Sequence, residues 1–238
     1  MHIRLLGIGF FVLTILFNPH AIIAQSKAPL EIHNIAPNIF VYTTYHTYKG
    51  ELFPANGLFV VSSQGVIIVD SPWDTTQFQP LLDTIYSISG KKAVISIGTH
   101  FHDDRIGGID FFKQNGISTY TSRYTDSILQ ARSIPRSAFH FERDTVFQMG
   151  DTEFRTFYPG PGHTQDNIVI WFPKQKILYG GCLIKTTSDS NLGNTADGDT
   201  KEYVQSVRKV KRKYSDAKLV IPGHKQWGGI ELVQHTLM

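Results

Sequence analysis

The sequence contains a single cysteine, Cys182, among 238 residues. One cysteine cannot form an intrachain disulfide, so a disulfide-stapled scaffold is excluded. The thiol then has three possible states: buried and inert, exposed and reactive, or bound to a metal ion as the thiolate. The sequence around it has to decide among these states.

Long hydrophobic runs are also missing beyond the first residues. The apolar run from Leu5 to Phe17 follows a positively charged start, and Ala24 supplies a small residue at a plausible cleavage point. This pattern is typical of a secretory signal peptide, and the run is too short to span about 30 Å of bilayer comfortably. We expect a signal peptide over residues 1–24, one domain over 25–238 and no membrane anchor after cleavage; an N-terminal anchor is the alternative.

A strong charge of either sign is the third absence, since the formal net charge is +3. One basic cluster interrupts this balance, but it alternates with apolar residues at helical spacing, which is typical of the solvated side of an amphipathic helix. We therefore expect no nucleic-acid partner. The basic residues are Arg208, Lys209, Lys211, Arg212 and Lys213, and the apolar ones are Val204, Val207, Val210 and Tyr214.

The apolar periodicity changes between strand-like and helix-like twice along the chain. A meander of strands over 30–69 is followed by a helix over 75–89, which ends at Gly90, and then by alternating strands and helices at 93–98, 106–113, 118–120 and 123–132. The second cycle has strands at 144–147, 153–158, 167–172 and 176–179, a helix at 200–214, a strand at 219–221 and a helical end. This repetition predicts an α/β fold with two packed mixed sheets and helices on the outer faces, a four-layer αββα sandwich.

The segment His100-Phe101-His102-Asp103-Asp104 directly follows an apolar strand. Two imidazoles and a carboxylate at this spacing suit zinc, because neutral nitrogen and carboxylate oxygen are ligands that this ion accepts. Alone, such a short motif is also compatible with coincidence on an exposed loop.

Three further segments follow predicted strands and carry metal-capable side chains beside glycine. They contain His163 in Gly162-His-Thr, Cys182 after Gly180-Gly181 and His224 in Pro222-Gly-His. Loops at strand ends can meet at one edge of a sandwich. Each side chain alone has an ordinary reading, as a hydrogen-bonded histidine or a small core thiol. Together with the first motif, however, they predict a metal site.

These residues together resemble the class B metallo-β-lactamases, and the nearest pattern is the first subclass. Arg105 follows Asp104 where most other members of the superfamily carry histidine, and Cys182 stands where they usually carry a bridging aspartate. His100 departs from the second subclass, which has asparagine there. Further residues that carry the resemblance are Thr99, Ile106 to Gly108, Gly181, Lys185, Gly193 and Asn194.

The resemblance implies two Zn²⁺ ions per chain. Its ligand sets would be His100, His102 and His163 for the first ion, and Asp104, Cys182 and His224 for the second. It further implies that a metal-bound hydroxide hydrolyses the ring amide of penicillins, cephalosporins and carbapenems, which gives antibiotic resistance. Asp104 would also orient the hydroxide.

The resemblance also implies substrate contacts. Lys185 would bind the substrate carboxylate, and Asn194 would contact the oxyanion, with Asn191 as a competitor for that role. The stretch 45–56 would be a hairpin over the substrate that contributes Phe53, and Trp73 would line the pocket floor. Without the family match, Lys185 would read as a surface lysine and Trp73 as a core residue.

The sequence thus predicts an exported, periplasmic, monomeric enzyme whose partner is a small β-lactam. One alternative is a hydrolase of thioesters or lactones on the same scaffold; it predicts a histidine after Asp104 and an aspartate at position 182, and neither is present. The other is an exported zinc-storage protein, which would need neither an open zinc position nor Lys185.

Overall fold

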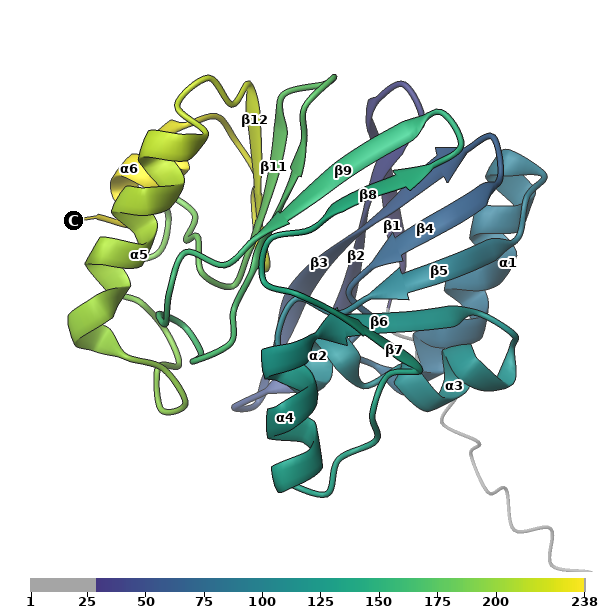
Figure 1. The fold of residues 1–238 in the computed structure, drawn as a ribbon, viewed down its shortest axis with the longest axis horizontal. Helices are drawn as coiled ribbons and strands as arrows, with labels where there is room; N and C mark the ends of the chain where they lie inside the picture. Colours follow the sequence, from purple (N-terminus) through teal and green to yellow (C-terminus); the bar gives the residue numbers. More distant parts are fainter. Residues whose placement is uncertain (1–28, 238) are drawn as a thin grey trace, which may run out of the picture.

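Two β-sheets face each other in the computed structural model, which describes residues 29–237 (Figure 1). The first sheet has the order β1-β2-β3-β4-β5-β6-β7, and the second has the order β12-β11-β10-β9-β8. The strands of the first sheet are β1 Glu31–Ala36, β2 Ile39–Tyr48, β3 Glu51–Ser62, β4 Gly65–Val69, β5 Ala93–Ile97, β6 Ser118–Ser122 and β7 Phe139–Phe141. Those of the second are β8 Val146–Met149, β9 Thr152–Phe157, β10 Val169–Phe172, β11 Ile177–Gly181 and β12 Leu219–Pro222.

Both sheets are mixed. In the first, β1 to β4 form an antiparallel meander with short turns, and β4 to β7 are parallel. Parallel neighbours need long crossovers, which here carry the helices. In the second, β8 to β11 are antiparallel, and β12 joins β11 in parallel. The helices are α1 Phe78–Ser89, α2 Asp103–Ile106, α3 Ile109–Gln114, α4 Arg123–Ala131, α5 Thr200–Lys213 and α6 Glu231–His235, with a 3₁₀ turn at Thr75–Gln77.

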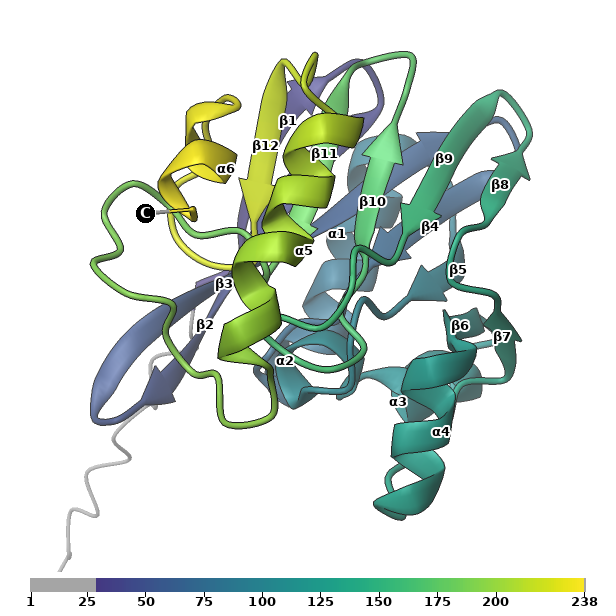
Figure 2. The same ribbon diagram turned by 60° about the vertical axis from the view of Figure 1, so that its left-hand side comes forward.

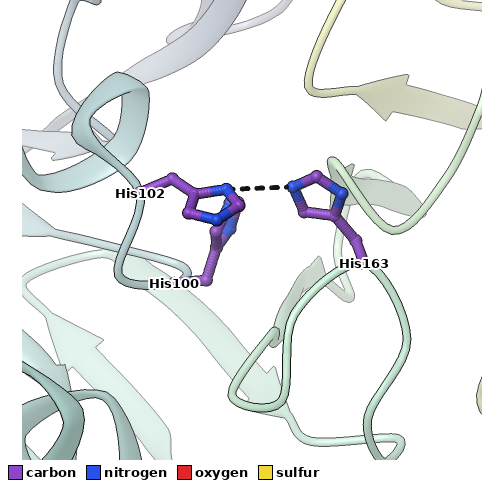
Figure 3. A group of neighbouring side chains, drawn as sticks. All are labelled: His100, His102 and His163. Carbon is purple, nitrogen blue, oxygen red and sulfur yellow. Dashed lines mark hydrogen bonds between the residues drawn. The ribbon is translucent and has the colours of Figure 1, made fainter. Parts of the chain in front are cut away.

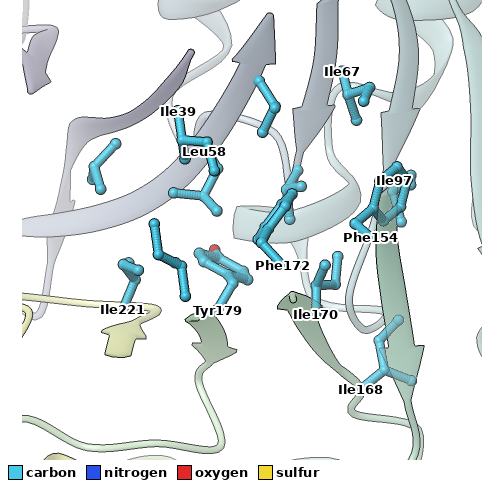
Figure 4. Packing of buried hydrophobic residues seen from close by; sticks show 14 of the residues in the cluster. Ile39, Leu58, Ile67, Ile97, Phe154, Ile168, Ile170, Phe172, Tyr179 and Ile221 are labelled. Atoms are coloured by element: carbon cyan, nitrogen blue, oxygen red, sulfur yellow. The ribbon is translucent and has the colours of Figure 1, made fainter. Parts of the chain in front are cut away.

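Three apolar layers hold the sandwich together. The central layer lies between the sheets and includes Leu58 and Ile67 from the first sheet and Ile170 and Phe172 from the second (Figure 4). One outer layer packs α1 and α3 on the first sheet, and the other packs α5 and α6 on the second. Figure 2 shows α5 and α6 on the outer face of the second sheet. The predicted αββα sandwich is therefore confirmed.

The ends of two helices follow from local sequence. Gly90 terminates α1 in the left-handed region, with φ 66°, where a residue without Cβ is unstrained. Asp199 begins α5 by accepting hydrogen bonds from the backbone N–H groups of Lys201 and Glu202. The predicted basic cluster occupies the exposed side of α5, as its amphipathic spacing required.

One predicted helix was wrong, and one short strand was not predicted. The predicted helix over 106–113 is two short helices, with Gly107 and Gly108 between them. A Cβ on Gly107 would lie 2.6 Å from the Asp103 carbonyl oxygen, so the chain turns there more tightly than a side chain permits. The motif was expected to form a loop, but its last residue, Asp104, lies in α2. The three-residue strand β7 was not predicted at all.

The stretch 45–56 is the far end of the β2–β3 hairpin. The two strands stay paired as far as Tyr48 opposite Glu51, and Lys49 and Gly50 make the turn. Both turn residues have positive φ, which is the conformation that two-residue hairpin turns favour.

None of the helices in the described range 29–237 is long and apolar enough to cross a bilayer. The expected signal peptide over 1–24 lies outside the described residues, so it stays a prediction.

The central layer gives a first test. Leu58→Ala should lower the free energy of unfolding by about 2 to 5 kcal/mol, since the side chain is fully buried between the sheets and its loss leaves a cavity. Urea titration of the zinc-loaded protein measures this. Val146→Ala on the edge strand β8 is the control, because that side chain is 61% exposed; it should change stability by about 0.5 kcal/mol or less. Similar losses in both variants would contradict the assigned core.

Candidate metal centre

The predicted ligands come from segments that follow four strands. His100 and His102 follow β5, and His163 lies in the loop after β9. Cys182 follows β11 directly, and His224 follows β12. The structure gathers these side chains, with Asp104 of α2, into two groups of three whose ligand atoms lie within 4.8 Å of one another.

His100, His102 and His163 make the first group (Figure 3). The ring centroids are 4.9 to 5.0 Å apart, and the rings stand nearly perpendicular to one another. Nε2 of His163 lies 3.2 Å from Nδ1 of His102. Burial lowers the pKa of His100 and of His163 well below the usual histidine value, and their mutual repulsion adds to this for His100. These two imidazoles are therefore neutral at pH 7, which is the form that binds metal.

The other ring contacts identify the nitrogens that remain for a metal. His102 Nε2 lies 3.2 Å from an Asp197 carboxylate oxygen. A carboxylate only accepts, so Nε2 carries the proton and Nδ1 keeps its lone pair. His100 Nδ1 lies 3.4 Å from the Thr99 hydroxyl, while its Nε2 is buried with no hydrogen-bond partner in the described part of the chain. Buried polar atoms are normally paired, so the unsatisfied Nε2 points to a ligand.

Asp104, Cys182 and His224 make the second group. The Cys182 Sγ atom lies 3.3 Å from His224 Nε2 and 4.0 Å from Asp104 Oδ2, and those two atoms are 3.3 Å apart. His224 Nδ1 donates to the Pro54 carbonyl at 2.8 Å, which leaves Nε2 as its ligand atom. Cys182 is 2% exposed and forms no disulfide, so it is not a reactive surface thiol. Its position beside His224 and Asp104 favours the metal-bound state over an inert core thiol.

The electrostatics of the second group favour charged forms. Burial alone would raise the pKa of Asp104, but the Arg105 guanidinium and then His224 outweigh it and hold the pKa well below the usual range. Burial would lower the pKa of His224, yet the Cys182 thiolate and Asp104 raise it to about 9. A cation in place of the histidine proton would meet the same two anionic groups.

Arg105 has a larger role in the structure than the sequence revealed. Its side chain is fully buried and ion-paired with Asp104 at 2.9 Å and with Asp70 at 3.4 Å. It also donates to the backbone carbonyls of Asn56 and Gly223, at 2.7 and 2.8 Å. In the sequence, Arg105 was notable only as the residue that follows Asp104. Its partners come from four separate segments, so no local pattern identified them.

Asp70 is a second residue that sequence reasoning missed. It directly follows β4, lies in the left-handed region at φ 65° and is fully buried. Its carboxylate accepts from the backbone N–H and hydroxyl of Thr99, at 2.8 and 3.0 Å, and from the Tyr179 hydroxyl at 2.7 Å. Asp70 therefore fixes the residue directly before His100. The one available signal was an aspartate at the end of the wholly apolar run Gly65–Val69.

The donor sets fit zinc. Two ligands of a tetrahedral zinc ion, at about 2.0 to 2.3 Å from the metal, lie about 3.3 to 3.7 Å apart. The measured separations of 3.2, 3.3 and 3.3 Å are close to this range, and the 4.0 Å sulfur–oxygen separation is a little longer. Nitrogen, thiolate and carboxylate are ligands that zinc accepts. The two groups thus fit two Zn²⁺ ions per chain.

A cleft of about 1110 Å³ opens over the two groups. It is lined by all the predicted substrate-contacting residues, Lys185, Asn194, Asn191, Trp73 and Phe53. The rings of Phe53 and Trp73 lie 5.2 and 5.9 Å from that of His224, so the hairpin and the segment after β4 form an aromatic wall beside the second group. Trp73 is thus at the cleft and not in the core.

The two polar substrate-contact candidates differ in burial. Lys185 is 9% exposed, and burial lowers the pKa of its ammonium, whereas the nearby Cys182 thiolate raises it. Asn194 is exposed in the loop after residue 187, and its side-chain oxygen accepts from the Ala196 backbone N–H. Asn191 lines the same cleft, so the choice between the two amides stays open.

An αββα sandwich with two metal-capable triads at one edge defines a binuclear zinc protein. Residues 50–224 match the model of the metallo-beta-lactamase superfamily. A metallo-beta-lactamase type 2 from Elizabethkingia meningoseptica is 40% identical over 213 residues, which cover 90% of this chain and 86% of the relative. The metallo-beta-lactamase IND-1 of Chryseobacterium indologenes is 37% identical over 97% of this chain and 96% of its own length.

Solved structures agree with these relatives. A metallo-beta-lactamase from Pontibacter korlensis superposes with a TM-score of 0.85 at 35% identity, over 88% of this chain and 97% of that one. The chain therefore belongs to the metallo-β-lactamase superfamily. Its two triads, with Cys182 and Asp104 in the second, fit the di-zinc pattern of the first subclass of the class B enzymes.

Zinc content tests the second group directly. Cys182→Ala should reduce the bound zinc from two ions per chain toward one, because it removes the thiolate that anchors the second group. Elemental analysis after dialysis measures the ratio. His140→Ala, at an exposed position outside both groups, should keep two ions. An unchanged ratio in Cys182→Ala would remove the thiol from the site.

Proposed function

We propose that this protein hydrolyses the ring amide of β-lactams with the help of two zinc ions and so confers antibiotic resistance. The observation that carries the proposal is the pair of triads, with the thiol of Cys182 in the second, at the floor of one open cleft. The relatives named metallo-beta-lactamases over nearly the whole chain support it.

His100, His102 and His163 would hold the first ion, and Asp104, Cys182 and His224 the second. Bound zinc supplies Lewis acidity, which lowers the pKa of a water molecule and polarises a carbonyl. Three imidazole ligands add no negative charge and would leave the first ion its full positive charge, whereas the carboxylate and thiolate would offset the charge of the second. No protein nucleophile is required for this reaction.

Two residues would act on the reacting atoms. Asp104 would orient the attacking water, because one of its oxygens is held by Arg105 and the carboxylate faces the cleft. Asn194 would donate its side-chain amide N–H to the oxygen that gains charge during attack. Its position in an exposed loop at the cleft is compatible with a contact that forms only once substrate is bound.

Lys185 would bind the carboxylate of the substrate. Its ammonium is largely buried beside the second group and lines the cleft, so an anion there would gain a partly desolvated partner. Phe53 and Trp73 would contact the apolar parts of the substrate, since both rings face the cleft next to His224.

Thioester or lactone hydrolysis on the same scaffold is less well supported. Arg105 fills the position after Asp104 with a fully buried guanidinium, so no further imidazole ligand is available there.

We also propose export to the periplasm, on the basis of the signal-like start, and a monomer that needs only the small substrate as partner.

Metal removal tests the proposal. Treatment with a chelator should abolish hydrolysis of a chromogenic cephalosporin, because the proposed reaction depends on the zinc ions and uses no protein nucleophile. Added Zn²⁺ should restore the activity. Absorbance of the opened product measures the rate. A panel with one penicillin, one cephalosporin and one carbapenem defines the substrate range. Full activity in the metal-free protein would refute the mechanism.

Lys185→Ala tests the assigned carboxylate contact. It should raise KM for substrates that bear the carboxylate by about tenfold with a smaller change in kcat, because the ammonium binds ground state and transition state alike. The matched control is a neutral ester analogue of the same substrate, whose KM should hardly change. An equal loss for the ester would contradict the assignment.

A further inference from the structure

Arg132 lies at the cleft and is unexplained by the proposed reaction. It caps the C-terminal end of α4, about thirty positions from the nearest ligand in the sequence, and its side chain is 49% exposed. No motif marks it. Two contacts of its side chain, however, lead toward the first triad.

The first contact is an ion pair with a residue that binds a proposed ligand. Arg132 Nη2 lies 2.8 Å from one carboxylate oxygen of Asp197, and the other oxygen accepts from Nε2 of His102 at 3.2 Å. The three side chains thus form a linear chain of charge-assisted hydrogen bonds. The guanidinium fixes the plane of the carboxylate, and the carboxylate fixes the tautomer and the orientation of the imidazole.

The second contact is with the segment that carries the ligands. The guanidinium carbon of Arg132 lies 4.2 Å from the ring centroid of Phe101, the residue between His100 and His102. Phe101 is 5% exposed, so the guanidinium covers one face of a ring that is otherwise enclosed.

Asp197 in turn is held by its backbone. Its carbonyl accepts from the N–H of Gln165 at 3.1 Å, and Asp199 donates to the Gly162 carbonyl at 2.9 Å. A Cβ on Gly198 would lie 2.0 Å from that same carbonyl oxygen, so the two segments touch closely. The loop that carries Asn194 is therefore fastened beside His163 at one end and to α4 through Arg132.

We propose that Arg132 is a positioning residue for the first zinc site, which acts through Asp197 to hold His102 with Nδ1 directed at the metal. The proposal rests on zinc binding by the first triad, and not on the identity of the substrate. Its distinctive consequence is that Arg132 and Asp197 act in series on one metal ion and leave the other ion alone.

Metal binding by site tests this. Asp197→Ala should weaken zinc binding at the first triad by about 10- to 100-fold, as loss of the direct partner of a ligand does, and Arg132→Ala should weaken it by about 3- to 10-fold. The double variant should bind no more weakly than Asp197→Ala, because Arg132 acts through the carboxylate. Competition with a chromophoric chelator measures the affinities without any substrate.

The cobalt-substituted protein separates the two sites. Only the second group contains sulfur, so the thiolate-to-cobalt charge-transfer band reports that site and should be unchanged in Arg132→Ala, while the ligand-field bands of the first site weaken. Arg123→Ala is the matched control, since it removes an arginine from the same helix that pairs with Glu142 at 2.8 Å. It should leave both sites unaltered.

Four results would overturn the proposal. Arg132→Ala could bind zinc at the first site as tightly as Arg123→Ala does. If KM for the substrate then rose alone, Arg132 would be a substrate contact and not a positioning residue. The losses in the double variant could multiply, which would make the two residues independent. Both cobalt signals could weaken together, which would indicate a general loosening of the edge. Loss of β-lactam hydrolysis in Arg132→Ala with unchanged metal affinities would also overturn this role, whereas a zinc-loaded wild-type protein without hydrolysis would contradict the proposed function alone.

Discussion

The buried guanidinium of Arg105 is the interaction on which the rest of the site depends. A charged group with 2% exposure needs ionic partners, since the desolvation of an unpaired ion costs several kcal/mol. Both Nη atoms of Arg105 have such partners, whereas its buried Nε has no hydrogen-bond partner among the described residues. Arg105 finds acceptors at Asp104 in α2, Asp70 after β4, Asn56 in β3 and Gly223 after β12. These contacts join loops and strands of both sheets, and they fix the segments that carry Asp104 and His224 of the second triad.

Close backbone packing around the guanidinium also restricts the conformation of the loop that carries His224. A Cβ on Gly223 would lie 2.6 Å from the Cys182 sulfur and 2.8 Å from Arg105 Nη2. Only glycine therefore lets the loop that carries His224 approach both groups. The neighbouring Asn56 side chain donates to the carbonyls of Pro222 and Lys225, at 3.0 and 2.7 Å, which secures the same loop from the side of β3. Metal ligation and sheet closure are parts of one packed unit.

Features that depend on short stretches of sequence could be predicted, whereas contacts between residues far apart in the sequence could not. The six ligand candidates could be found because each follows an apolar strand and lies in a recognisable short motif, and the periodicity gave both sheets. The tetrad of Asp70, Thr99, Tyr179 and Arg105 could not be found, because it joins residues up to 109 positions apart and has no period. The helix α2, which contains Asp104, was also missed. It has only four residues before Gly107 and Gly108, which is too few to show the apolar spacing of a helix.

The two triads differ in the charge that their surroundings already supply. The first offers three imidazoles and no anionic ligand, so a dication there keeps its charge and its power to polarise a bound water. The second presents a carboxylate and a thiolate, but Arg105 lies 2.9 Å from that carboxylate and offsets part of its charge. A cation in the second site is thus attracted by two anionic ligands and repelled by a fixed guanidinium that cannot move away, because its other partners hold it. The residue that joins the two sheets therefore also opposes the charge of a cation in the second site.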